Sequence, residues 1–324
     1  MSNLERHPQE AVCGGRAAVA VEPVRELLPG AEVTLGPRGN RVVRTLPNRD
    51  RRMVGAWCFA DHYGPEDLTA RPDARMRVPP HPHTGLQTVS WLVAGEVLHR
   101  DSLGNTQPIE PGQLNLMTAG RGIAHAEESP PDHPPTLHGV QLWVALPDAA
   151  RAVDPHFEHH AALPVLTDRG VTVTVLMGEL DGAASPAGVY TQLVGAEATL
   201  DAGADTRLPL RPDFEYAALA LSGAVEVDGV PLPPGPLLYL GSGRSDLALR
   251  ADRPGRVLLL GGEPFDERIV MWWNFVERDH EEIVAARDAW MDGSRFKAVH
   301  GYDGAPLPAP PMPTVRLRPR GRHR

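Results

Sequence analysis

Two histidines, His81 and His83, are separated by a single residue in the segment "VPPHPHTGLQTVSWLVAGEVLHRDSLGN". Alternate residues of a β-strand point to the same side, so the two imidazoles are expected to share one face. A second pair with the same spacing, His125 and Glu127, occurs in "GIAHAEES". If the two strands are neighbours in the wall of a barrel, three imidazoles and one carboxylate converge.

This donor set suits a first-row transition metal. With two coordination positions left open, it is similar in type to the His-plus-carboxylate sites of non-haem Fe(II) enzymes. Cysteine ligands are absent from the set, which argues against structural zinc. The alternative is that these are surface or turn histidines, because the chain has 14 histidines and short motifs occur by chance. Both pairs, however, stand at Gly-rich strand ends.

The segments around these pairs have the pattern of short strands joined by turns. The 32 glycines and 34 prolines are scattered in short turns, and this favours many short strands over long helices. Gly-bounded apolar runs begin near residue 33 and begin again near residue 171, whereas residues 1–30 look like a loose lead-in. The spacing predicts an all-β fold of sandwich or barrel type.

The second region repeats part of the first. Leu92–Met117 can be laid over Ala220–Leu240 if one hairpin shortens by five residues. The positions that then coincide are Gly95 with Gly223, and Pro111-Gly112 with Pro234-Gly235. A strand, a hairpin, a Pro-Gly turn and another strand occur twice, so we expect an internal duplication and two β-barrels packed together.

The duplication provides an internal control for the metal hypothesis. Counting from the matched glycines places Pro209, Arg211, Ala248 and Arg250 where the first region has its histidines and glutamate. None of these side chains is a plausible metal ligand. We therefore expect only the first barrel to bind metal, with the second barrel structural.

The expected organisation is a first barrel over 31–165, a metal-free second barrel over 166–265, and a C-terminal part over 266–324. The C-terminal part contains one predicted helix in "ERDHEEIVAARDAWMDG", where Asp279 and Glu282 can form a capping box and Gly293 can end the helix. One face carries apolar residues that are expected to dock on a barrel, namely Ile283, Ala286 and Trp290. A Pro-rich arm, "DGAPLPAPPMP", follows.

Other polar residues of these strands are weaker candidates. In "LHGVQLW", His138 and Gln141 fall on opposite faces, and either could support a ligand or be an edge-strand polar residue. His62 in "DHYG" and His99 in "VLHRDS" are expected to serve turns. The cluster "HFEHH", residues 156–160, could hold an adventitious metal, but a solvated position in the linker between barrels is favoured.

Composition excludes several classes of protein. A hydrophobic content of 42% and a charged content of 23% indicate a soluble globular protein. The formal net charge of −9 argues against direct nucleic-acid binding, despite the short basic end "RLRPRGRHR". Cys13 and Cys58 make no disulfide framework, no apolar stretch is long enough for a membrane span, and no signal-peptide pattern is present. A cytoplasmic location is expected.

Four segments carry a family resemblance. "HPHTGLQTVSWLVAGEVLHRDSLGN", "PGQLNLMTAGRGIAHAEE" and "LHGVQLWVALP" resemble the signature of the pirin family, a branch of the cupin superfamily, and "MWWNFVERDHEEIVAARDAWMDGSRF" is similar to bacterial pirins. The resemblance implies a bicupin of two jelly-roll barrels. It also implies that His81, His83, His125 and Glu127 bind one transition-metal ion, with Fe(II) favoured, below a pocket open to solvent.

The resemblance implies two functions of different class. Some members of the family act as quercetin 2,3-dioxygenases, which open a flavonol or related phenol with O₂, and Glu127 would then be both ligand and general base. Other members are non-enzymatic, iron-dependent regulators that act through a protein partner, such as a transcription factor or a metabolic enzyme. The enzyme is the favoured hypothesis, with a small phenolic substrate.

Overall fold

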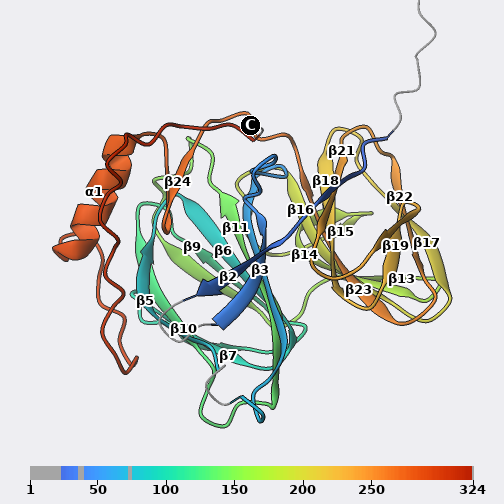
Figure 1. Ribbon diagram of the computed structural model, residues 1–324, viewed down its shortest axis with the longest axis horizontal. Coiled ribbons are helices and arrows are strands. Elements are labelled where there is room, and N and C mark those ends of the chain that lie inside the picture. Colours follow the sequence, from blue (N-terminus) through green and yellow to red (C-terminus); the bar gives the residue numbers. More distant parts are fainter. Residues whose placement is uncertain (1–22, 36–39, 72–74, 323–324) are drawn as a thin grey trace, which may run out of the picture.

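The computed structural model describes residues 23–35, 40–71 and 75–322. It consists almost entirely of β-strands arranged as two barrels side by side, with a short helix on the outer flank of the first barrel (Figure 1). The predicted all-β fold of two packed barrels is therefore confirmed.

The first barrel is made of two sheets that face each other. The larger sheet has the order β12-β9-β6-β11-β4-β3-β2 and the smaller sheet has the order β5-β10-β7-β8. The strands of the larger sheet are β2 (Ala31–Leu35), β3 (Asn40–Leu46), β4 (Trp57–Asp67), β6 (Leu86–Ala94), β9 (Leu114–Thr118), β11 (Thr136–Ala145) and β12 (His156–His160). Those of the smaller sheet are β5 (Arg77–His83), β7 (Val97–Asp101), β8 (Thr106–Ile109) and β10 (Ile123–Glu128).

The second barrel repeats this arrangement. Its larger sheet has the order β1-β21-β18-β23-β16-β14-β13, with β15 beside β14, and its smaller sheet has the order β17-β22-β19-β20. The strands of the larger sheet are β1 (Glu26–Leu28), β13 (Val165–Asp168), β14 (Val171–Leu180), β15 (Ala183–Ala184), β16 (Leu193–Leu200), β18 (Glu215–Ser222), β21 (Leu237–Gly241) and β23 (Gly255–Gly262). Those of the smaller sheet are β17 (Ala204–Pro209), β19 (Val225–Val227), β20 (Val230–Leu232) and β22 (Asp246–Ala251).

The matched glycines occupy equivalent turns in the two barrels. Gly95 joins β6 to β7 with φ of +99°, and Gly223 joins β18 to β19 with φ of +69°. A Cβ atom would lie 2.6 Å from the Thr136 carbonyl oxygen at the first turn and 2.5 Å from the Pro254 carbonyl oxygen at the second. Glycine is required at both turns because the backbone is left-handed and a neighbouring strand lies too close for a side chain.

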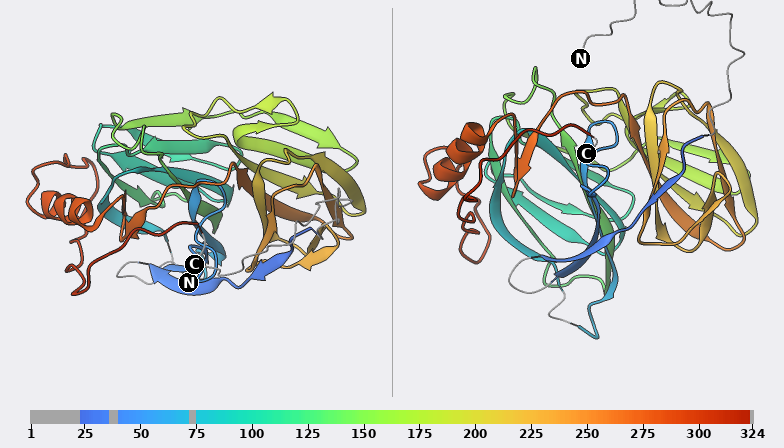
Figure 2. Two further views of the ribbon diagram at one scale, coloured as in Figure 1. Left: turned by 90° about the horizontal axis from the view of Figure 1, so that it is seen from above. Right: turned by 45° about the horizontal axis from the view of Figure 1, so that its top comes forward.

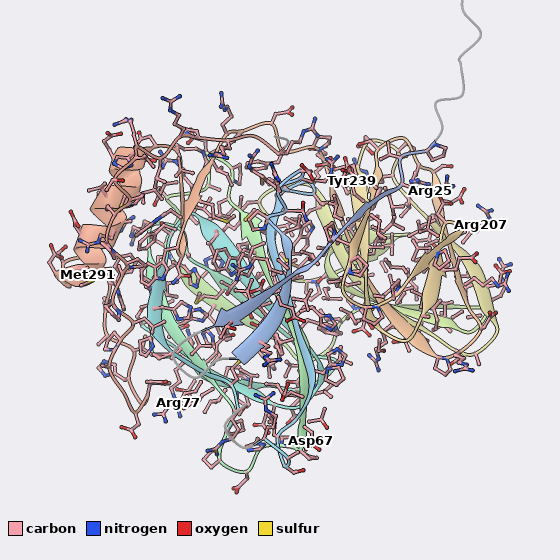
Figure 3. All side chains as sticks on the ribbon, in the orientation of Figure 1. Arg25, Asp67, Arg77, Arg207, Tyr239 and Met291 are labelled. Atoms are coloured by element: carbon pink, nitrogen blue, oxygen red, sulfur yellow. The ribbon has the colours of Figure 1, made fainter. Side chains whose placement is uncertain are left out.

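The expected loose lead-in over residues 1–30 lies outside the described residues up to residue 22, and from residue 23 onward the expectation is wrong. β1 pairs with β21 and adds a strand to the second barrel, although the chain then continues directly into the first barrel. The preceding Arg25, labelled in Figure 3, lies on the second barrel, where its guanidinium is 2.7 Å from the Asp228 carboxylate. A strand of three residues has too weak a periodic signal to be recognised in the sequence.

The two barrels are joined by a largely apolar interface that contains a few satisfied polar groups. Trp57 on β4 is fully buried, and its Nε1–H lies 3.2 Å from the Val194 carbonyl oxygen and 3.1 Å from that of Gly261, both in the second barrel. The Glu215 carboxylate of the second barrel accepts a 2.7 Å hydrogen bond from the Gly55 N–H. Buried polar groups that find partners across an interface hold the two bodies in one arrangement.

The C-terminal part covers one side of the first barrel (Figure 2). Its regular elements are β24 (Val270–Trp272), β25 (Phe275–Glu277) and α1 (His280–Met291). As predicted, the Asp279 side chain caps α1 by accepting from the Glu282 N–H at 2.9 Å, and Gly293 follows the helix with φ of +72°. The Glu282 carboxylate accepts from the Arg278 N–H at 2.8 Å, one residue earlier than a standard capping box requires.

The Pro-rich arm is in contact with both α1 and the first barrel. The Leu307 N–H donates to the Pro80 carbonyl oxygen of β5 at 2.9 Å, and the Leu307 carbonyl accepts from Trp290 Nε1–H at 2.8 Å. Ile283 and Ala286 of α1 are buried in a cluster with Phe275. Among the described residues, no helix has the length and apolar character that a membrane span requires.

Candidate metal centre

Strands β5 and β10 are direct neighbours, and their register brings the two histidine-bearing pairs together. His125 lies opposite His81, whereas Glu127 lies opposite Val78, so β5 carries one extra residue between these positions. The extra residue falls at Pro79-Pro80, where the missing N–H groups make regular pairing impossible. β5 is an edge strand of its sheet, where proline is tolerated.

Three imidazoles converge in the barrel interior. The potential ligand nitrogens of His81, His83 and His125 all lie within 4.8 Å of one another, and all three side chains are buried. His81 Nδ1–H donates to the Pro79 carbonyl oxygen at 2.8 Å, and His83 Nδ1–H donates to the Asn274 carbonyl oxygen at 3.1 Å. A carbonyl can only accept, so the Nε2 atoms of these neutral rings carry free lone pairs.

The lone pairs point toward one another. His83 Nε2 and His125 Nε2 are 3.1 Å apart, and the ring centroids of His81 and His125 are 4.4 Å apart. Nitrogen lone pairs at such separations repel each other, and a metal cation between them would turn this repulsion into attraction. The donor set and the backbone carbonyls that orient it fit a transition-metal ion, because metal-binding imidazoles characteristically donate their second N–H in this way.

Electrostatics favour the uncharged imidazoles that a metal requires. Burial lowers the pKa of His81 to about 4. Burial also lowers the pKa of His83 and that of His125 well below the ordinary value, and the neighbouring imidazoles add to both shifts. All three rings are therefore neutral at physiological pH and available as ligands.

The Glu127 carboxylate lies in the same cavity, but it does not belong to the group of potential ligands formed by His81, His83 and His125. Its oxygen falls in a second group of potential ligands with His99 and His125, again within 4.8 Å of one another. The Ser90 hydroxyl lies 3.1 Å from Glu127 Oε1 and 2.9 Å from Gln141 Oε1. Burial raises the pKa of the Glu127 carboxyl above its usual range, while the His99 imidazole and the Ser90 hydrogen bond oppose this shift.

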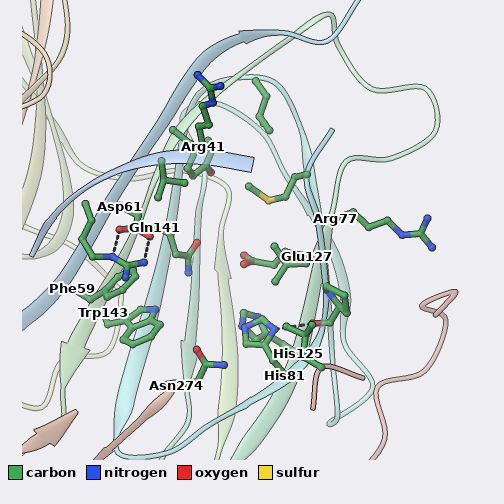
Figure 4. Close-up of a pocket in the computed structure, with 18 of the residues that line it drawn as sticks. Arg41, Phe59, Asp61, Arg77, His81, His125, Glu127, Gln141, Trp143 and Asn274 are labelled. Carbon is green, nitrogen blue, oxygen red and sulfur yellow. Dashed lines mark hydrogen bonds and ion pairs between the residues drawn. The ribbon is translucent and has the colours of Figure 1, made fainter. Parts of the chain in front are cut away.

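A cavity of about 450 Å³ opens above the imidazoles (Figure 4). One wall is a stack in which the Arg44 guanidinium lies 4.4 Å above the Phe59 ring, and Phe59 lies parallel to Trp143 at 4.0 Å. Trp143 meets the His83 ring edge-on at 5.1 Å. The wall therefore extends from the rim to the imidazoles, and its flat apolar surface suits an aromatic ligand.

The two weaker candidates, His138 and Gln141, have different positions relative to the cavity. β11 lies between β4 and β6, so neither residue is on an edge strand as one alternative supposed. Gln141 lines the cavity, where it contacts Ser90. His138 is directed away from the cavity, with its Nε2 2.8 Å from that of His62.

His62 was expected in a turn, and this is wrong. It is a buried residue of β4, in a strand whose first seven residues are all buried. The tight turn implied by "DHYG" does not form, because the strand continues through Gly64 to Asp67. His62 and His138 form a buried pair of imidazoles in the wall of the first barrel.

This pair makes stability depend on pH. Burial lowers the pKa of His62 to about 4, and the charge of His138 adds to the shift. An unfolded histidine has a pKa near 6.5, so between pH 6.5 and 4 only the unfolded chain binds this proton. The stabilisation that comes from keeping His62 neutral is therefore complete above pH 6.5 and is lost as the pH falls toward 4.

Between pH 6.5 and pH 5, the free energy of unfolding measured in urea should fall by about 2 kcal/mol more in the wild type than in His62→Phe. An equal fall in the two proteins would contradict the prediction.

His99 was also expected in a turn, and the structure places it beside the imidazole group. It is buried on β7, and its Nδ1 lies 3.4 Å from Nδ1 of His125. The sequence does contain a signal, since His99 and Asp101 have the same alternate spacing as the two pairs described first. The turn interpretation rests on the segment "VLHRDS", in which only Ser102 lies beyond the end of β7.

The cluster "HFEHH" is not a solvated linker. It forms strand β12, which pairs with β9 at the edge of the first barrel. Its residues are half-buried, and His160 Nε2 lies 3.0 Å from the Glu158 carboxylate.

In the second barrel, strands β17 and β22 correspond to the histidine-bearing strands β5 and β10 of the first. Three leucines of these two strands, Leu208, Leu247 and Leu249, belong to the apolar core of the second barrel.

Two packed barrels with an imidazole-lined cavity in the first define a protein of the bicupin class. The solved structure of a quercetin 2,3-dioxygenase from Acinetobacter baumannii matches this chain with a TM-score of 0.85 and 42% identity. The match covers 90% of this chain and 97% of that structure.

The sequence defines the family more narrowly. Residues 39–144 match Pirin and residues 195–297 match the Pirin C-terminal cupin domain. A Pseudomonas aeruginosa protein named "Putative quercetin 2,3-dioxygenase PA1205" is 49% identical over 85% of this chain and 87% of its own length. Pirin of Homo sapiens is 34% identical over 76% of this chain and 85% of its own length. The chain belongs to the pirin family, as the resemblance implied.

Proposed function

We propose that this protein is a metal-dependent dioxygenase of the quercetin 2,3-dioxygenase type, which opens a flavonol or a related phenol with O₂. The observation that carries the proposal is the group of three neutral imidazoles, with free lone pairs, at the base of an aromatic-walled cavity of about 450 Å³. Cavities of this size bind ligands the size of a flavonol. The names of the Pseudomonas and Acinetobacter relatives support the same chemistry.

In this proposal the metal is one Fe(II) ion held by His81, His83, His125 and Glu127. When bound, such an ion would supply Lewis-acid stabilisation of a phenolate and one-electron exchange with O₂. The Glu127 carboxylate lies 3.1 Å from the Ser90 hydroxyl, and one of its oxygens is within 4.8 Å of a potential ligand nitrogen of His125. The same carboxylate is the proposed general base, since it is the acidic side chain nearest to the imidazoles in the cavity lining.

Other residues of the cavity bind and orient the phenol. The Phe59 and Trp143 rings offer a flat surface along which an aromatic substrate can lie with its hydroxyl toward the imidazoles. Ser90 has one hydroxyl proton but two oxygen neighbours, Glu127 Oε1 and Gln141 Oε1. If the Gln141 amide is turned over, its N–H donates to Ser90 and Ser90 donates to Glu127, so that each of the two contacts has a donor and an acceptor.

The decisive experiment follows oxygen uptake with quercetin by the Fe(II)-reconstituted protein and by the metal-free protein. The proposal expects uptake only with metal, at a rate that matches the loss of the flavonol absorption band. Bound iron without oxygen uptake would contradict the enzyme and favour the regulator that acts through a protein partner. A panel of phenols that leaves the metal's absorption spectrum unchanged would support the same conclusion.

A further inference from the structure

Two buried polar side chains beside the imidazole group have no part in the proposed ligand set. Strand β7 pairs with β10 so that Asp101 lies opposite His125 and His99 lies opposite Glu127. His99 is 3% exposed and Asp101 is 1% exposed. Burying an imidazole and a carboxylate in a barrel is costly unless both are hydrogen-bonded. Their partners therefore indicate what they do.

The Asp101 carboxylate is fixed by its own turn. It accepts hydrogen bonds from the Leu103 N–H at 2.9 Å, from the Asn105 N–H at 3.1 Å and from the Asn105 side-chain amide at 2.8 Å. His99 Nε2 lies 3.3 Å from Asp101 Oδ2. An ionised carboxylate can only accept, so the proton of this contact belongs to His99 Nε2.

Placing the proton on Nε2 also determines the protonation of the other His99 nitrogen, Nδ1. If the His99 ring carries a single proton, held on Nε2 by Asp101, then its Nδ1 keeps a free lone pair, and this Nδ1 lies 3.4 Å from His125 Nδ1. That lone pair can accept the Nδ1–H of His125. His125 Nε2 is then free of a proton and faces His83 Nε2 at 3.1 Å. In the opposite arrangement, His125 would carry its proton on Nε2 and would be unable to bind a metal there.

The His99 ring is also held against rotation. It stacks on the Phe157 ring of β12, with centroids 4.4 Å apart and planes inclined by 13°. Its two nitrogens therefore keep their directions, one toward Asp101 and one toward His125. A partner that is fixed in this way selects one tautomer of His125, as acceptors of metal-binding histidines generally do.

We propose that His99 and Asp101 are a positioning pair, which holds His125 in the Nδ1-protonated tautomer and so prepares its Nε2 for the metal. The chain of hydrogen bonds runs from the Asp101 carboxylate through His99 to His125. The inference rests on the assignment of His125 as a metal ligand in the proposed function. It concerns metal binding, so it does not require the bound metal to react with O₂.

The first test needs no metal. Long-range ¹H–¹⁵N NMR spectra of the imidazoles, recorded on the full-length metal-free protein at pH 7.5, report which nitrogen of each ring carries the proton. We expect Nδ1–H for His125 in the wild type and a shift toward Nε2–H in His99→Phe. An Nε2-protonated His125 in the wild type would overturn the proposal.

The second test measures cobalt(II) affinity by competition with a chelator. His99→Phe keeps an aromatic ring against Phe157 but removes the acceptor, so affinity should fall roughly 10- to 100-fold. In His99→Gln the side-chain oxygen can still accept from His125, and most of the affinity should return. His62→Phe is the matched control, because it removes another buried imidazole of the same barrel and should bind cobalt(II) as the wild type does.

The outcomes separate this proposal from the proposed function. Wild-type affinity in His99→Phe, or an equal loss in His99→Phe and His62→Phe, would overturn the positioning role alone. A wild type that binds cobalt(II) but consumes no oxygen when loaded with iron would overturn the dioxygenase and leave the positioning pair supported. A wild type that binds no metal would overturn both.

Discussion

Replacement of His83 by alanine is expected to weaken metal binding by roughly 10² to 10³-fold. Four-ligand metal sites bind with about 10–16 kcal/mol, so one ligand accounts for roughly 2.5–4 kcal/mol, and each 1.4 kcal/mol is a factor of ten. His83 is 1% exposed, and its Nδ1–H is held by the Asn274 carbonyl, so no other side chain can take its place without rearrangement. Metal content after equilibrium dialysis at increasing Fe(II) concentration measures the change.

The control for this prediction is His156→Ala. His156 belongs to the histidine-rich strand β12, its side chain is 41% exposed, and it would report any adventitious binding by that cluster. We expect His156→Ala to retain the metal affinity and the oxygen uptake of the wild type. If His83→Ala retained its metal while His156→Ala lost it, the site would lie on β12 and not in the barrel.

Replacement of Glu127 by glutamine is expected to lower the rate of flavonol oxidation by roughly 10² to 10⁴-fold, the usual contribution of a general base. Glutamine has the same shape and can still contact Ser90, which lies 3.1 Å from the carboxylate. It cannot take the phenolic proton. Metal content should fall less than the rate, because the three imidazoles remain. Steady-state oxygen uptake and metal analysis of the same samples test both statements.

Glu128→Gln is the matched control for this variant. Glu128 is the next residue of β10 and is paired at 3.3 Å with Arg100, away from the imidazole group. The same chemical change at this position should leave both rate and metal content near their wild-type values. Equal activity of Glu127→Gln and wild type would rule out Glu127 as the base, whatever its part in metal binding.

Much of this molecule could be predicted from local patterns. The alternate spacing of His81 with His83, and of His125 with Glu127, follows from the two-residue period of a strand, and the structure places all four side chains in one cavity. The duplication around Gly95 and Gly223 is visible because a left-handed turn beside a close backbone tolerates no other residue. The cap of α1 at Asp279 is equally local.

Other parts depend on pairings between distant segments. The segments around His62 and His99 predict turns because they contain turn-forming residues, yet both histidines lie within strands. β1 joins the second barrel although it precedes the first, a pairing that no local pattern specifies.

Local sequence patterns are enough to predict which residues share a strand face, that the barrel motif occurs twice, and that a capped helix follows. Which groups contact those faces depends on tertiary contacts. The tertiary structure brings the Asn274 carbonyl to His83, the Phe59 and Trp143 rings to the cavity wall, and the His99–Asp101 pair to His125. The physical reason is that strand periodicity is a property of neighbouring residues, whereas strand order and register are fixed by the burial of side chains far apart in the chain.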